Sequence, residues 1–98
     1  MSLRSDPVSE HAKLPHGRGY VEVWVGVPDD SYVPKSEIST VDLQLREGET
    51  ILASVTTVLE PDQDGDARRL ARDVRAAIEA DSMALTAAAL EEFADRLR

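Results

Sequence analysis

The stretch from Glu37 to Pro61 constrains the fold most, because it combines a regular apolar alternation with a glycine-containing turn. Along residues 41–45, Val-Asp-Leu-Gln-Leu, apolar and polar side chains alternate with a period of two. That period is typical of a β-strand with one buried face. Gly48 follows where a tight turn needs a positive φ, which glycine adopts without a Cβ clash. The stretch therefore predicts a β-hairpin around which the rest of the chain packs.

The same residues predict the register of this hairpin. A three-residue loop over residues 46–48 places Leu43 opposite Ile51, and apolar side chains then share one face. A two-residue loop over residues 47–48 places Leu43 opposite Leu52 instead and leaves Ile51 outside. Because a slip of one residue exchanges the two faces of a strand, the first register is favoured. The predicted buried set is Val41, Leu43, Leu45, Ile51, Ala53 and Val55, and the opposite face is only half polar.

A second strong strand signal lies in residues 19–27, Gly-Tyr-Val-Glu-Val-Trp-Val-Gly-Val. The four valines alternate onto one face, which is expected to join the inner face of the hairpin. The other face carries Tyr20, Glu22 and Trp24. An exposed Trp–Tyr pair is a plausible anchor for a partner, since aromatic side chains offer a large contact area at low entropic cost. The alternative is that Trp24 packs under the N-terminal segment or a helix of the same chain.

Two helices are expected after the hairpin. Residues 67–80 place Leu70, Val74 and Ile78 on one stripe, and Asp66 precedes them as a predicted N-cap. A second helix is predicted to start after Thr86 as N-cap, with Leu90, Phe93 and Leu97 at helical spacing. The order β-β-β-α-α predicts an α+β two-layer sandwich, in which an antiparallel three-stranded sheet is followed by two helices.

The domain organisation follows from length and composition. The chain has 98 residues, enough for one domain with a modest core. Residues 1–18 hold few large apolar side chains, two prolines and both histidines, so they are predicted to form a flexible tail. The α+β domain is predicted to cover residues 19–98. His11 and His16 are expected to be exposed rather than to bind a metal, because a flexible segment does not preorganise a site.

Charge and composition exclude several classes of protein. The formal net charge is −8, and residues 19–66 carry eleven acids against Lys35 and Arg46. This acidic region repels phosphate backbones, so nucleic-acid binding through it is disfavoured. The chain contains no cysteine and no apolar run long enough to span a bilayer. We expect a soluble, cytoplasmic protein without membrane contact, and the excess of arginine over lysine is typical of a GC-rich bacterial genome.

No catalytic, cofactor or metal site is predicted. Motifs such as G-x-S-x-G, a glycine-rich phosphate loop and H-E-x-x-H do not occur. The paired carboxylates at residues 29–30 and 62–66 are candidates for catalysis, but nothing in the sequence brings them into one pocket. Residues 60–71 fail as a calcium loop, because Ala71 occupies the twelfth position, where a bidentate glutamate is required. The chain is therefore predicted not to be an enzyme, with no evident small-molecule substrate.

The leading functional hypothesis is a small protein-interaction or regulatory module. It is expected to bind a protein partner, or a second copy of itself, through the outer sheet face or an open sheet edge. The candidate contact residues are large side chains on a face that is otherwise polar: Tyr20, Trp24, Leu52 and Val58.

The alternative hypothesis is a nucleic-acid- or ribosome-associated module. Arg68, Arg72 and Arg75 recur on one helical face and form an arginine stripe that is able to contact phosphates. The stripe has no interleaved aromatic residues, and its arginines are more simply explained as surface residues that pair with nearby acids. An acidic mimic of nucleic acid is a third, less specific, possibility.

Overall fold

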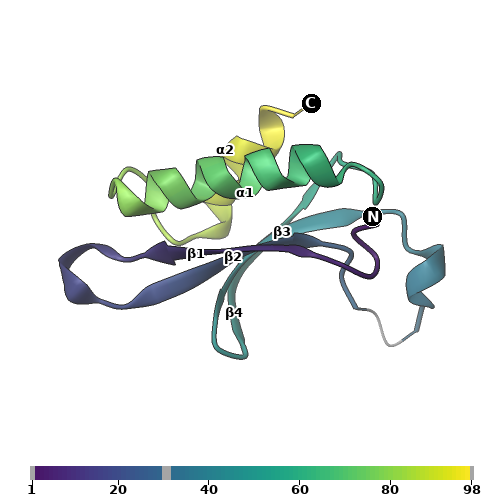
Figure 1. Cartoon of the computed structure of the whole chain (residues 1–98), viewed down its shortest axis with the longest axis horizontal. Helices are drawn as coiled ribbons and strands as arrows, with labels where there is room; N and C mark the ends of the chain where they lie inside the picture. The colour runs from purple at the N-terminus through teal and green to yellow at the C-terminus, as the bar shows by residue number, and fades with distance from the viewer. Residues whose placement is uncertain (1, 30–31, 98) are drawn as a thin grey trace.

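The fold is α+β, with one antiparallel sheet and two helices (Figure 1). The computed structural model describes residues 2–29 and 32–97. The strands are β1 (Val8–Lys13), β2 (Tyr20–Gly26), β3 (Val41–Glu47) and β4 (Thr50–Thr57), and they lie side by side in chain order. The helices are α1 (Asp64–Glu79) and α2 (Ala87–Asp95). The predicted fold class is confirmed, but the sheet has four strands rather than three.

The additional strand comes from the segment predicted to be a flexible tail. β1 pairs with β2 along its whole length, from Val8 opposite Val25 to Lys13 opposite Tyr20. The segment holds few apolar residues, but Leu3, Ala12 and Leu14 are all buried. The prediction that residues 1–18 stay outside the domain is wrong. The composition of this segment alone is misleading, because the other strands and the helices supply most of the core that the segment joins.

The first residues close one end of the molecule. The Leu3 amide donates to the Pro61 carbonyl at 2.7 Å, and the Val27 amide donates to the Leu3 carbonyl at 3.5 Å. The Arg4 guanidinium donates to the Ile38 carbonyl at 3.0 Å. The N-terminal segment is thus tied to the end of β2, to the connection before β3 and to the loop before α1.

Both helices lie on the same face of the sheet (Figure 1). α1 packs over β1 and β2, and α2 packs over β4 and the neighbouring part of β3. The core between the layers contains the β2 valines, as predicted, together with Leu43, Leu45 and the apolar stripe of α1. We call this helix-covered side the inner face of the sheet, and the other side the outer face.

The hairpin register differs from the prediction. Leu43 lies opposite Val55 instead of Ile51, and a two-residue turn joins Glu47 to Thr50. That turn alone would pair Leu43 with Ser54 and bury polar side chains. A β-bulge leaves Leu52 without a partner on β3 and shifts the rest of β4 by one residue, so that Ala53 and Val55 point inward. The two-residue turn places Ile51 opposite Arg46 on the outer face, ahead of the bulge, where it is 52% exposed, so its predicted burial is wrong.

The helix starts follow local chemistry. α2 has the predicted N-cap, since the Thr86 hydroxyl accepts a hydrogen bond from the Ala89 amide at 3.2 Å. α1 starts two residues before the predicted cap, so that Asp66 lies in its first turn and Gln63 takes the cap position. In the first turn, the carboxylates of Asp64 and Asp66 interact favourably with the positive N-terminal end of the helix dipole.

Candidate protein-interaction site

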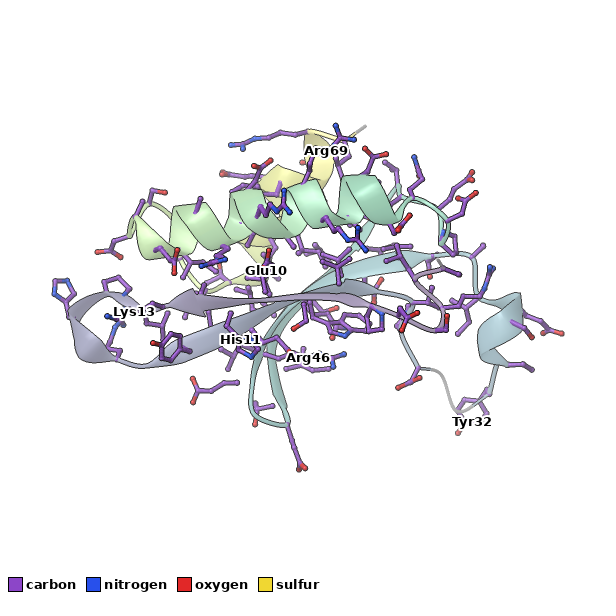
Figure 2. The ribbon with its side chains drawn as sticks, viewed as in Figure 1. Glu10, His11, Lys13, Tyr32, Arg46 and Arg69 are labelled. Atoms are coloured by element: carbon purple, nitrogen blue, oxygen red, sulfur yellow. The ribbon has the colours of Figure 1, made fainter. Side chains whose placement is uncertain are left out.

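Trp24, the predicted aromatic anchor, lies on the outer face but is covered by its own chain. It is only 8% exposed. The Arg46 guanidinium carbon lies 4.0 Å from the centroid of the indole ring, and Arg46 Nε donates to the buried Gln44 side chain at 2.8 Å. Figure 2 shows Arg46 and His11 below the sheet, on the side away from the helices. A stacked guanidinium held by a second side chain leaves little indole surface for a partner.

Gly26 completes the cover over Trp24. A Cβ atom added to Gly26 would lie 2.7 Å from Pro7 Cβ and 2.9 Å from Trp24 Cζ2. The residue before β1 and the indole therefore both press against the Gly26 backbone, which only glycine permits at this spacing. The packing of Trp24 within the chain, which the sequence left open as an alternative, is what the structure shows. The predicted exposed Trp–Tyr pair does not form.

The other predicted contact residues are exposed but do not form one patch within a chain. Tyr20 is 62% exposed at the start of β2. Leu52 and Val58 are 40% and 49% exposed, and both belong to the β4 region. Six residues of extended chain separate them, which is about 20 Å. The prediction missed Ile51, the most exposed of the aliphatic residues in β4, because it favoured a three-residue loop, whereas the two-residue turn pairs Ile51 with Arg46 on the outer face.

β4 is an open edge of the sheet. In the strand order β1-β2-β3-β4 it has β3 on one side, and no further strand pairs with its other side within residues 2–29 and 32–97. Residues 50–59, Thr-Ile-Leu-Ala-Ser-Val-Thr-Thr-Val-Leu, contain no charged residue, no proline and no glycine. We call this segment the uncharged run, and the side of β4 that faces away from β3 the β4 edge. Such a strand offers unpaired backbone groups to another chain, with no charged side chain or proline to oppose pairing and a bulge only near its start.

β1, the opposite edge, is protected in several ways. Glu10, His11 and Lys13 lie within its six residues, and Pro7 and Pro15 flank it. Glu10 points from β1 toward α1 (Figure 2). Its carboxylate lies 3.9 Å from Arg72 and 3.5 Å from Arg75. The Lys13 amide donates to the Glu79 carboxylate at 3.0 Å, which ties this edge to the C-terminal part of α1.

The arginine stripe is paired with acids along its length. Arg68 lies 3.9 Å from Asp64, while Arg72 and Arg75 share Glu10. Arg75 also lies 3.5 Å from Glu79. A groove of about 350 Å³ beside the stripe is lined by Asp6, Pro7, Val8, Ser9, Glu10, Asp64, Arg68 and Arg72. Its acids outnumber its arginines, so the groove is a poor site for a phosphate.

A second groove, of about 230 Å³, runs between the two helices. Leu70, Phe93 and Leu97 form its apolar wall. The Arg96 guanidinium lies 4.6 Å from the centroid of the Phe93 ring, so the chain itself covers part of this wall. The remaining lining residues are Asp66, Arg69 and Asp73 of α1 and Arg96, which follows α2.

Asp42 is the ionisable residue with a perturbed environment on the outer face. Burial raises the pKa of its carboxyl above the ordinary value, against hydrogen bonds from Thr56 and Gln44, which lower it. Asp42 pairs with Thr56 across β3 and β4, next to the uncharged run. The partners of this carboxyl are a hydroxyl and an amide, and the raised pKa alone does not define a catalytic site.

Two acids of the 62–66 cluster are paired with neighbouring side chains. Asp64 lies beside Arg68, and Asp66 is ion-paired with Arg69 and bonded by the Gln63 amide. Asp30 lies outside the described residues. In the part of the chain that the structure describes, no three ligating side chains gather where they could hold a metal ion.

Comparisons with protein-family models, curated proteins and solved structures find no match to the chain. Among the described residues, neither helix has the length and apolar character needed to cross a membrane.

Proposed function

We propose that this protein is a small non-enzymatic interaction module that binds an extended protein segment along the β4 edge. The observation that carries the proposal is the combination of an unpaired edge with the uncharged run of residues 50–59. Strand addition to such an edge forms main-chain hydrogen bonds, while alternate side chains supply specificity.

The exposed aliphatic residues support this mode of binding. Ile51, Leu52 and Val58 border the β4 edge and are each at least 40% exposed. An added strand would contact them on the outer face, where α1 and α2 do not reach. Because Trp24 is covered, the edge has more support as a binding site than the centre of the outer face.

The alternative of a nucleic-acid-associated module has weaker support. Each residue of the arginine stripe lies within 4 Å of an acid, and the chain carries a net charge of −8. Nucleic-acid binding would have to break these pairs and overcome long-range repulsion.

A displayed library of random peptides tests the proposal. The chain is immobilised at low density, and the selected peptides are mapped onto it by backbone amide resonances. We expect the peptides to shift the amides of residues 50–57 and to lose about tenfold or more in affinity for a Ser54→Glu/Thr56→Glu variant. Ser9→Gln, a substitution on the other edge that keeps a donor for the Glu22 carboxylate, is the control and should bind normally. Peptides that bind the helices or β1 instead would contradict the proposal.

A further inference from the structure

We infer that the strand that adds to the β4 edge is β4 of a second copy of this chain. The inference rests on the proposed function and specifies its partner. The two β4 strands run antiparallel about a twofold axis at Val55, so that residue 55 of each copy faces residue 55 of the other. Two four-stranded sheets then join into one sheet of eight strands.

Within the uncharged run, residues 51–59 are roughly symmetric in residue type about Val55. In the twofold pairing, Leu52 faces Val58 and Ser54 faces Thr56, which are pairs of similar character, while the small Ala53 faces Thr57. An antiparallel homodimer requires such a self-complementary strand, because each contact occurs twice. A strand selected only to meet a different protein would not need this symmetry.

The pairing also explains why the exposed aliphatic residues lie at opposite ends of the run. Leu52 and Val58 are about 20 Å apart within one chain. Across an antiparallel pair, directly opposed side chains lie about 5 Å apart. The twofold axis therefore brings Leu52, at the bulge of each copy, toward Val58, one residue beyond β4 of the other, and covers both exposed residues at once.

The charge distribution directs association to this edge. A net charge of −8 on each copy opposes close approach, and β4 is the strand of the sheet without ionisable side chains. Glu49 and Glu60 flank the run and fall at the two ends of the paired strands, beyond the aliphatic contacts. Because the remaining electrostatic term is repulsive, added salt should strengthen the dimer. Nucleic-acid binding would show the opposite salt dependence.

The protected β1 strands end the combined sheet. The strand order becomes β1-β2-β3-β4 followed by the same strands of the partner in reverse, with all four helices on one face. Both outer edges are then β1, whose Glu10, His11 and Lys13 oppose further strand addition. The association stops at two copies instead of growing into a fibre.

Engineered cysteines test the register directly, because the natural chain contains none. Ser54 and Thr56 are exposed, so Ser54→Cys and Thr56→Cys should fold normally. A mixture of the two variants should form disulfide-linked dimers about fivefold or more in excess of either variant alone, since residue 54 faces residue 56. Ser9→Cys on β1 is the matched control and should not crosslink. Equal crosslinking of all three variants would overturn the inference.

Sedimentation of the natural chain measures the association itself. One added strand per copy buries less than the roughly 1,600 Å² of a standard interface, so we expect a Kd on the order of 10 µM that decreases with salt. Ser54→Glu/Thr56→Glu should be monomeric, because like charges then face each other. Ser54→Lys/Thr56→Glu places opposite charges in the same positions and should restore the dimer.

The two proposals fail separately. If the natural chain stays monomeric up to a protein concentration of about 300 µM, the homodimer inference is overturned. Mapping of library peptides to β4 would still support the interaction module in that case. The homodimer inference is also overturned if the dimer crosslinks through β1, or if it forms equally well with the double glutamate variant. The proposed function is overturned if the library peptides bind away from β4.

Discussion

β1 and β4 each end the sheet, but they do so in different ways. β1 carries three ionisable residues in six, is flanked by prolines, and is tied to α1 through Glu10 and the Lys13 amide. β4 carries no ionisable residue in eight and has exposed Ile51 and Leu52. Each strand has one side without a neighbouring strand, and only β1 has charged side chains and flanking prolines that oppose pairing with another strand. An edge strand is therefore best judged by what protects it rather than by its exposure alone.

The largest expected effect concerns the segment that leads into β1. Leu3→Ala should lower the free energy of unfolding by about 2–4 kcal/mol, because Leu3 is fully buried and its truncation leaves a cavity. Leu52→Ala, beside the other edge, is the control and should change stability far less, since Leu52 is already exposed. Urea denaturation measures both. An unchanged midpoint for Leu3→Ala would mean that the N-terminal segment is the tail that its composition suggests.

Gly26 tests the corner where this segment meets the outer face. Gly26→Ala should cost about 1–3 kcal/mol, because the added methyl group would press on Pro7 and Trp24. Gly65→Ala is a matched control in α1, where nothing lies within 4 Å of the added Cβ and alanine favours the helix. Emission from Trp24, the sole tryptophan, reports the same site and should shift to longer wavelength only for Gly26→Ala. Equal stability of the two variants would refute close packing at this corner.

Glu10 tests the protection of β1. Glu10→Gln should destabilise the fold by up to about 1 kcal/mol, because Arg72 and Arg75 lose their shared acid and the pairs are partly exposed to solvent. The loss should shrink in high salt, which screens the pairs in the natural chain. Glu49→Gln, in the turn before β4, serves as control. A loss independent of salt would show that packing, rather than charge, holds β1 to α1.

The smallest expected effect lies beside β4. Burial raises the pKa of Asp42 above its ordinary value. The contribution of Asp42 to folding stability is therefore complete at a pH below the ordinary pKa, and it is lost as the pH rises through the folded-state pKa. Asp42→Asn should therefore be more stable than the natural chain near neutral pH, within about 0.5 kcal/mol. The difference should vanish in acid. Urea denaturation across this pH range checks the sign, and a natural chain favoured at neutral pH would contradict it.

The strand pattern of β2 and the helix stripes could be predicted because they depend on local periodicity. Val21, Val23 and Val25 are buried as expected, and Thr86 caps α2. β1 could not be recognised in this way. Its alternation, with Glu10 and Ala12 facing inward, is apolar only in part, and Glu10 is accommodated by arginines that lie more than sixty residues away in the chain.

The candidate site shows the same division. The uncharged run of residues 50–59 and its approximate symmetry about Val55 are properties of the sequence, as are the four-valine strand and the two amphipathic helices. Only the tertiary structure decided that β4 lies at an edge, that a bulge at Leu52 turns Ala53 and Val55 inward, and that Arg46 covers Trp24. Periodicity reflects the solvent exposure of each residue along its own strand, whereas strand order, bulges and side-chain stacking depend on contacts between segments that are distant in the chain.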